Sequence, residues 1–491
     1  MVPEMRRRRG RHRRGRDETY KTCETYDVHN PPRKGRHTMT PTQRVAQFVA
    51  SVKFDDLPEH VVEKARVTLL HDITVGVAGF RKASVPMELA RATGPDAAGG
   101  GGRLLVDGTR VTVEAAAFAN AALIHARTQD DTYLPGLTHV GCTALPAVLS
   151  LADSLDSDGR AFVTAMVAGY EAVAAIGEGW AARATSRGLR ATGVFGPIGA
   201  ATACARLLEC DPQQIASALG LAAGFAGGTN QTWVAGTQEW QYQPGIASRN
   251  GLTAALLAAR GVTSAPDALE GAAGFYRSYT GDPDGAENVG EQLGTEWRIG
   301  AVTYKPFPIC ALNQLPVSTL LDLLAASPTP PDDVEHIALA LPPGDAAYPG
   351  IDAKGPFTDV GATLMSAQYC LAVGLIRGGI GLDDLTAFDD AAVTDLVQRI
   401  DVVPDADLPR GGCRLTVRTR SGAVREREAT PTAETFNWGR DETASRARRL
   451  AAESPLDGEQ MERLIDTILR VDLLPVADLV AATVVPDGTE R

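Results

Sequence analysis

The sequence predicts a mainly α-helical protein that also carries a smaller unit of mixed helices and strands. Three observations predict this class. Alanine and glycine are abundant while aromatic residues make up only 5%, which favours closely packed helices over an aromatic-rich β-sandwich. Apolar residues recur at helical spacing through most of residues 57–261. Well-defined strand patterns occur only after residue 300.

The helical part begins with a helix that the sequence predicts after Leu57. Pro58 suits a first turn, and Val61, Ala65 and Leu69 recur every four residues on one face. Between residues 113 and 261, further segments are rich in small residues and apolar around most of their circumference, as the buried helices of a bundle are. We expect residues 39–289 and 431–491 to form one all-helical domain.

The texture of the sequence changes near Tyr304. Residues 334–343 and 413–430 read as strands, the second as a hairpin through Ser421 and Gly422, and a helix at 366–379 lies between them. We therefore expect residues 290–430 to form a separate α+β unit.

The first 38 residues differ from the rest in charge. They hold twelve Lys/Arg and five Asp/Glu, a net charge of +7. Because the whole chain has a net charge of −12, the remaining residues carry −19. An acidic body has no general attraction for nucleic acid or anionic membranes. We interpret residues 1–38 as a disordered basic extension, or as the product of a start codon assigned too early with Met39 as the true start; a nucleic-acid arm is the alternative. No apolar segment of a signal peptide follows the arginine run.

Other features favour a cytoplasmic protein without a metal. No run of eighteen apolar residues is present, so we expect no membrane-spanning segment. The seven cysteines are scattered and form no CxxC, which fits reduced thiols. Only five histidines follow Met39, and no two are spaced as metal ligands.

The densest polar cluster of the helical part runs from His125 to His139. Adjacent carboxylates at Asp130 and Asp131, the hydroxyl of Thr132 and the imidazole of His139 could serve acid–base chemistry. The same residue types also cap helices and stabilise loops, so a purely structural segment is the alternative.

Two further segments could bind an anion. Lys305 lies between Tyr304 and a Pro-Phe-Pro run, which would hold its ammonium group in place beside a carboxylate or an enolate; a surface lysine before a strand is the alternative. The polar and aromatic loop 236–245 could offer backbone N–H groups at the start of a helix, or be a plain loop.

Six blocks of sequence, taken in order, resemble the MmgE/PrpD family, which includes 2-methylcitrate dehydratases, cis-aconitate decarboxylases and an iminodisuccinate epimerase. The resemblance covers about residues 42–484, and the blocks are LPEHVVEKARVTLLHDITVGVAGF, AAFANAALIHA…DDT…H, ATGVFGPIGAATACARLL, QQIASALGLAAG, PGIASRNGLTAALLAARG…LEGAAGFYRSY and YKPFPICALNQ. It implies a large helical domain built from both chain ends, a smaller α+β lid domain, an active site between them and a homodimer. It also implies chemistry without a cofactor, on a small carboxylate or carbonyl substrate, and no nucleic-acid or membrane partner.

The resemblance assigns catalytic roles to several positions. Asp130, Asp131 and His139 match the family's D-D-T…H run, Lys305 matches the lysine of its K-P-F-P block, and Tyr348 matches a tyrosine of the lid. His139 would transfer the proton and Lys305 would hold an anion, while the two carboxylates would orient them.

Other positions of the implied pocket depart from the family pattern. The residues expected to contact the substrate there are Thr128 in place of an acidic residue, the matching Thr132, Arg190 and Cys310 in place of histidines, Trp240 in place of a lysine, and Gln243 in place of a histidine. Each lost cation removes about 2–3 kcal/mol of a buried charge-assisted contact, so two losses lower the affinity for a tricarboxylate about a thousandfold. We expect a substrate less anionic than citrate, with Trp240 offering a flat apolar surface.

Three hypotheses follow for the activity. The first is a dehydratase- or decarboxylase-type lyase that removes a proton or CO2 next to a carboxylate or carbonyl. The second is an isomerase, epimerase or cyclase that uses the same deprotonation without a leaving group. The third is a non-catalytic relative that only binds its ligand, in line with the lost histidines.

Overall fold

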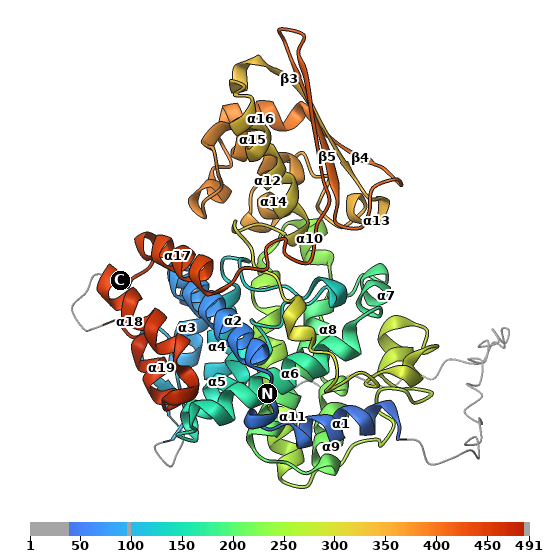
Figure 1. Ribbon diagram of the computed structural model, residues 1–491, viewed down its shortest axis with the longest axis vertical. Helices are drawn as coiled ribbons and strands as arrows, with labels where there is room; N and C mark the ends of the chain where they lie inside the picture. Colours follow the sequence, from blue (N-terminus) through green and yellow to red (C-terminus); the bar gives the residue numbers. More distant parts are fainter. Residues whose placement is uncertain (1–38, 96–99, 486–491) are drawn as a thin grey trace, which may run out of the picture. The chain divides into compact units, whose positions relative to one another are not determined.

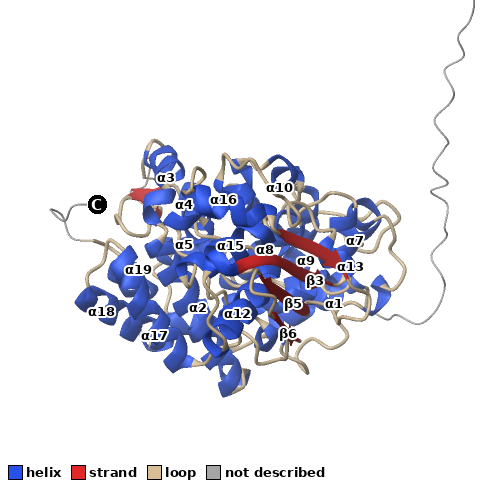
Figure 2. Ribbon diagram, turned by 90° about the horizontal axis from the view of Figure 1, so that it is seen from above, coloured by secondary structure: helices blue, strands red, loops and turns tan. Residues whose placement is uncertain are grey.

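The computed structural model describes residues 39–95 and 100–485; the predicted basic extension, residues 1–38, lies outside them. Helices dominate the described part and the strands gather mainly in one small sheet (Figures 1 and 2), which confirms the mainly α class. Two hydrophobic clusters organise the packing. The first draws on residues 45–304 and 444–485, and the second on residues 309–417 together with Trp233 and Trp240.

The first cluster is built from helices at both ends of the chain. Its N-terminal helices are α1 (Pro41–Ser51), α2 (Glu59–Ala78), α3 (Ser84–Arg91), α4 (Val113–His125), α5 (Ala144–Ser154), α6 (Gly159–Gly177), α7 (Ala181–Ser186), α8 (Ala191–Leu207), α9 (Pro212–Gly224) and α11 (Gln243–Ala259). Its C-terminal helices are α17 (Arg440–Leu450), α18 (Gly458–Leu469) and α19 (Val476–Ala482). The short helix α10 (Gln231–Ala235) instead contributes Trp233 to the second cluster. The C-terminal helices α17 and α18, red in Figure 1, pack against α2, drawn in blue.

Small residues let the central helices α6, α8 and α11 approach closely. A Cβ added to Gly169 of α6 would lie 2.8 Å from the carbonyl oxygen of Gly199 in α8, and one added to Gly251 of α11 would lie 2.4 Å from that of Pro197. Neither contact tolerates a side chain, so the glycine and alanine content noted in the sequence serves helix packing.

One helix, α6, is long and apolar enough by length and composition to cross a membrane, and 89% of its apolar window is buried inside the protein. It packs against α8 and α5 in the middle of the first cluster. The helical part also contains one short hairpin, β1 (Gly102–Arg103) with β2 (Arg110–Val111), so it is not purely helical as expected.

The second cluster surrounds a four-stranded sheet, and we call residues 307–429 the lid. The strands are β3 (Val334–Leu341), β4 (Ile400–Pro404), β5 (Cys413–Thr419) and β6 (Val424–Ala429), in the order β4-β3-β5-β6. Strand β4 runs parallel to β3, and the other neighbours are antiparallel. The predicted hairpin through Ser421 and Gly422 is the β5–β6 turn, whereas the sequence pattern missed β4.

Helices α12 (Ala311–Ala326) and α15 (Ala367–Arg377) pack on this sheet, with α13 (Pro343–Ala346), α14 (Val360–Met365) and α16 (Ala391–Gln398) around them. Alternate residues of β3 and β5 are fully buried, as Ile337, Leu339, Leu415 and Val417 show, because one face of the sheet meets the helices.

The two chain crossings between the helical part and the lid lie side by side. Thr303 pairs with Thr132 through backbone hydrogen bonds of 2.9 and 3.0 Å, and the N–H of Tyr304 donates to the carbonyl of Phe436 at 2.8 Å. Residues 290–304, expected in the α+β unit, pack on the first cluster instead, because Ile299, Val302 and Tyr304 bury their side chains there.

Candidate active site

The loop after α4 presents the central carboxylate of the site. Helix α4 ends at His125, and the chain then turns so sharply that Thr128 adopts a left-handed backbone conformation (φ 49°). A β-branched residue is strained there, and strain of this kind is concentrated at functional sites. The turn directs the carbonyl of Thr128 to the ammonium group of Lys305, which donates a hydrogen bond to it. The next carboxylate along the chain, Asp130, is fully buried.

Arg190, His125 and Asp130 form a chain of hydrogen bonds. The Nη2 of Arg190 lies 2.7 Å from Nε2 of His125, and Nδ1 of His125 lies 2.8 Å from Oδ1 of Asp130. Because a guanidinium group can only donate, Nε2 must accept, and the single imidazole proton therefore sits on Nδ1 and points at Asp130. Burial also lowers the pKa of His125, which keeps the imidazole neutral.

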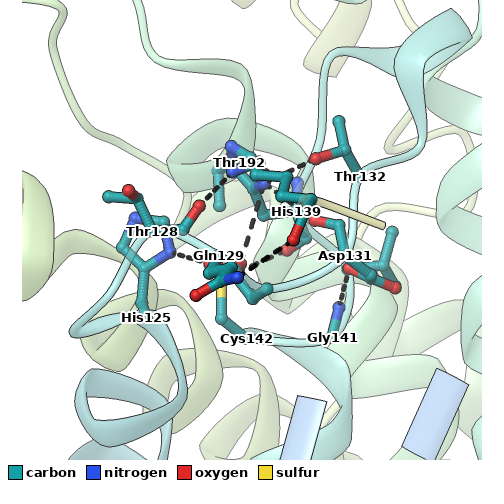
Figure 3. A network of polar contacts seen from close by, with 12 residues as sticks. His125, Thr128, Gln129, Asp131, Thr132, His139, Gly141, Cys142 and Thr192 are labelled. Carbon is teal, nitrogen blue, oxygen red and sulfur yellow. Dashed lines mark hydrogen bonds and ion pairs between the residues drawn. The ribbon is translucent and has the colours of Figure 1, made fainter. Parts of the chain in front are cut away.

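His139 is held with one ring nitrogen available. Its Nδ1 lies 2.8 Å from the carbonyl oxygen of Asp131 and 3.6 Å from Oδ2 of Asp130, so Nδ1 carries the proton. Figure 3 shows the ring beside Thr132, whose hydroxyl is 3.2 Å from Nδ1, and Thr192, which accepts from the backbone N–H of His139. Within residues 39–95 and 100–485, Nε2 has no hydrogen-bond partner. Burial and the charge of Lys305 hold the pKa of His139 well below its usual value, so the ring is a neutral base.

Positive charge surrounds this base. The side chain of Lys305 is 3% exposed, and burial lowers its pKa although Asp130 and the thiols of Cys310 and Cys142 oppose the change. Burial would raise the pKa of Asp130, but His125, His139 and Lys305 outweigh it and lower the pKa of that carboxyl. Asp130 is thus ionised, and Oδ2 has no hydrogen-bond partner in the described part of the chain.

The lid contributes Tyr348 and Cys310 to the same place. Both lie within electrostatic range of Arg190 of the helical part, and both are only partly buried. Burial raises the pKa of the Tyr348 phenol above its usual value, so the hydroxyl remains a proton donor at neutral pH. The structure therefore brings together His139, Lys305, Asp130, Arg190, Tyr348 and Cys310 of the residues chosen from the sequence.

Trp240 and Gln243 support Arg190 rather than standing open. The Nη1 of Arg190 donates to the carbonyl of Trp240 and lies 3.3 Å from Oε1 of Gln243. The indole of Trp240 is 4% exposed, stacks on Trp233 and meets the His125 ring edge-on. The flat surface that the sequence suggested is thus a wall behind His125. The helix of this loop begins at Gln243, not at Gly245.

Asp131 points away from His139 into a second group of polar side chains. Its Oδ1 accepts from the N–H of Gly141 at 2.8 Å, and its Oδ2 accepts from the hydroxyl of Tyr170 at 2.8 Å (Figure 3 shows the Gly141 bond). Its own N–H donates to Asp72 at 2.9 Å. Although adjacent in sequence, Asp130 and Asp131 thus belong to different networks.

One trio could in principle hold a metal ion. Ligand atoms of His125, Asp130 and Cys142 lie within 4.8 Å of one another, and all three residues are buried. Both nitrogens of His125 are already used, by Arg190 and by Asp130. A divalent cation there would also face the fixed charges of Arg190 and Lys305, so the residues present do not fit a metal.

Sequence reasoning assigned no role to His125, Cys142 or Tyr170. His125 does stand in the H-x-x-x-x-D-D pattern, and its placement at the end of an alanine-rich helix is a usable signal. The positions of Cys142 and Tyr170 beside the loop that follows α4 depend on the packing of helices α5 and α6 there, which no local sequence pattern reveals.

Two family models match most of the chain. Residues 43–287 match the MmgE/PrpD N-terminal domain, and residues 307–467 match the MmgE/PrpD C-terminal domain. The chain belongs to the MmgE/PrpD family. It is 26% identical over 444 residues to a cis-aconitate decarboxylase of Aspergillus terreus, covering 86% of this chain and 87% of that protein.

Two further MmgE/PrpD relatives are similar over most of their length. A cis-aconitate decarboxylase-like protein, oryM, of Aspergillus oryzae is 27% identical over 467 residues, which cover 88% of this chain and 94% of the relative. The human cis-aconitate decarboxylase is 25% identical over 384 residues, or 73% of this chain and 76% of that protein.

Proposed function

We propose that this MmgE/PrpD protein is a lyase of the dehydratase or decarboxylase type, working with side chains alone on a carboxylate or carbonyl compound less anionic than citrate. The observation that carries the proposal is His139: a neutral imidazole with Nδ1 bound to a backbone carbonyl and Nε2 free, beside the cations Lys305 and Arg190. A base next to fixed positive charge is the arrangement needed to remove a proton from the carbon beside a carboxylate.

In the dehydratase form, Nε2 of His139 accepts the proton of that carbon, and the electron pair of the broken C–H bond moves toward the carboxylate. Lys305 and Arg190 stabilise the enolate-like charge. The pair then forms a carbon–carbon double bond as the β-hydroxyl leaves, protonated by the phenol of Tyr348, as water. In the decarboxylase form the carbon–CO2 bond breaks instead, and the resulting carbanion takes a proton from the phenol of Tyr348.

The charge of the pocket supports a substrate with one or two carboxylates. Arg190 already commits Nη1 to Trp240 and Nη2 to His125, which leaves little of its fork for a ligand. Lys305 shares its ammonium group with the carbonyl of Thr128. A third carboxylate would lack a cation and would lie near ionised Asp130, at a cost of several kcal/mol.

An isomerase or epimerase is the second candidate. Tyr348 from the lid and His139 from the helical part are two proton-transfer groups on different elements, so the enolate can be reprotonated by a group other than the one that deprotonated it. Loss of a leaving group is then unnecessary.

One experiment separates these activities. The purified full chain is incubated in D2O with a panel of mono- and dicarboxylic acids, and products are followed by NMR. A lyase gives an unsaturated product or CO2, and an isomerase gives deuterated or inverted substrate without elimination. A protein that shifts its melting temperature with a panel member but neither converts nor exchanges it would contradict both and favour a binding role.

A further inference from the structure

A separate cavity of about 150 Å3 lies on the other side of the Lys305 segment. Its walls come from α2, from the loop at Arg127 and Gln129, from residues 305–308, from Ile380 of the lid and from one face of α17. Neither His139, Arg190 nor Tyr348 lines it. Its volume far exceeds the ~15 Å3 needed for one water, so it can hold a small polyatomic ligand.

The lining of this cavity is strongly basic. Arg127, Lys305, Arg446 and Arg449 face a single lining carboxylate, Glu453. Arg127 is 2% exposed and binds Glu453 at 2.7 Å. Arg446 and Arg449 share one carboxylate, that of Glu442, which lies four and seven residues earlier on α17, at 2.7 and 3.6 Å. Among the described residues, three guanidinium groups therefore have two carboxylates as ion-pair partners.

Hydroxyls and an amide accompany these charges. Thr74 and Thr443 line the cavity beside Gln129, and apolar walls come from Pro308, Ala447 and Leu450. Because the hydroxyls of Thr74 and Thr443 already donate to carbonyls of their own helices, the guanidinium groups are the donors for a ligand. Guanidinium groups in a partly enclosed space suit the oxygens of a planar carboxylate or a tetrahedral phosphate.

We propose that this cavity is a second ligand site, which binds a small oxyanion such as phosphate or a monocarboxylate. The anion supplies the negative charge by which the two carboxylates of Glu453 and Glu442 fall short of the three guanidinium groups. The ligand joins α17 to the loop of Arg127 and to the lid residue Ile380, so its binding stabilises the contact between the helical part and the lid.

The cavity is connected to the active site through Gln129. Its side-chain oxygen accepts from Nε of Arg127 at 3.1 Å, and its side-chain nitrogen donates to the carbonyls of Lys305 and Pro306, each at 3.1 Å. An anion that reorients Arg127 therefore acts on the backbone that carries Lys305. This effect on turnover rests on the proposed function, whereas the binding itself does not.

The test measures the melting temperature of the full chain against inorganic phosphate, and separately acetate, at constant ionic strength with chloride as the balancing salt. We expect a saturable rise for at least one anion, since a ligand that binds only the folded state stabilises it by mass action. The stronger response identifies the anion. The Arg446→Gln/Arg449→Gln variant should need at least tenfold more anion for the same rise.

Two variants make the result decisive. Arg448→Gln changes a guanidinium on the same helix that pairs with Glu462 and does not line the cavity, so it should respond like the wild type. Arg190→Gln alters the active site and should also keep the response. If the double variant fails to fold, the single change of Arg449, which is 59% exposed, replaces it and should weaken binding severalfold.

The proposal is overturned by the absence of a saturable rise in the wild type, or by equal responses in the wild type and the α17 variants. Loss of the response in Arg190→Gln alone would place the anion in the active site and overturn it too. Absence of turnover with every acid would sink the proposed function without affecting these melting curves.

Discussion

Two buried carboxyl groups separated by one peptide bond have pKa values shifted in opposite directions in this protein. Asp130 accepts a hydrogen bond from Nδ1 of His125 and lies near His139 and Lys305, and its pKa is lowered. Asp131 faces the carboxyl of Asp72 and the phenol of Tyr170. Burial, together with the charge of Asp130, raises the pKa of Asp131 to about 7, although hydrogen bonds from Gly141 and Tyr170 oppose the change. Burial is equal at 0% exposure, so the charge of the neighbours decides the difference.

The two carboxyl groups belong to two clusters of side chains, one proposed to carry out the reaction and one that holds helices and loop together. We call His125, Asp130, His139, Arg190 and Lys305 the catalytic cluster, after the role proposed for it, and Asp72, Asp131 and Tyr170 the acid cluster. In the catalytic cluster, the ionised carboxylate of Asp130 lies beside the partly exposed imidazole of His139. The acid cluster ties α2 and α6 to the loop between Asp130 and Gly141, where an added Cβ on Gly141 would lie 1.9 Å from Oδ2 of Asp72.

Replacing His139 should give the largest effect. His139→Gln removes the base while keeping a hydrogen-bonding side chain, so kcat/KM should fall about a thousandfold with little change in melting temperature. His336→Gln, which changes a partly exposed lid histidine paired with Asp401, is the control and should retain activity. Turnover by the His139 variant at the wild-type rate would remove this residue from the mechanism.

Asp130→Asn should affect both stability and activity. Neutralising this carboxylate leaves Arg190 and Lys305 buried without their counter-charge, at a cost of about 3 kcal/mol in the free energy of unfolding measured by urea denaturation at pH 7. The stabilising contribution of a carboxyl with a lowered pKa is present above its unfolded pKa of about 4 and is lost at lower pH, so the gap between wild type and variant should narrow below pH 4. Asp56→Asn, at an exposed position, should change neither quantity.

Asp72→Asn tests the acid cluster. A carboxyl with a raised pKa stabilises the fold below its unfolded pKa of about 4, and this contribution is lost as the pH rises toward 7. Removing one of the two carboxyls lowers the pKa of Asp131, so the variant should be more stable than the wild type at pH 8 by on the order of 2 kcal/mol. Denaturation curves at pH 5 and pH 8 measure the change. Parallel pH dependence in the two proteins would contradict the assignment.

Metal removal should have the smallest effect. Arg190 donates a hydrogen bond to Nε2 of His125, so the trio of His125, Asp130 and Cys142 has no free set of ligand atoms. Dialysis against EDTA should therefore leave turnover and melting temperature unchanged. A loss of activity that Zn2+ restores would show that His125 rotates away from Arg190 to bind a metal.

The sequence predicted the catalytic cluster better than the acid cluster, and the reason is physical. His139, Lys305 and Arg190 stand in local patterns, so their types and neighbours could be read along the chain. The direction of the Asp131 side chain depends on a turn with a strained Thr128 and on Asp72 and Tyr170 from distant helices. Strand β4 escaped notice similarly, because its five residues form a strand only beside β3.

The paired crossings have a consequence for how this enzyme family can diversify. The backbone of Thr303, two residues before Lys305, is hydrogen-bonded to that of Thr132, so Lys305 moves with the helical part. Cys310 and Tyr348 come after this crossing and move with the lid. Any rotation of the lid about the two chain crossings would keep the imidazole of His139 and the ammonium group of Lys305 in place relative to each other. It would displace only the thiol of Cys310 and the phenol of Tyr348. Exchanging lids between relatives should thus alter which acid is accepted while the proton-abstracting apparatus is inherited intact.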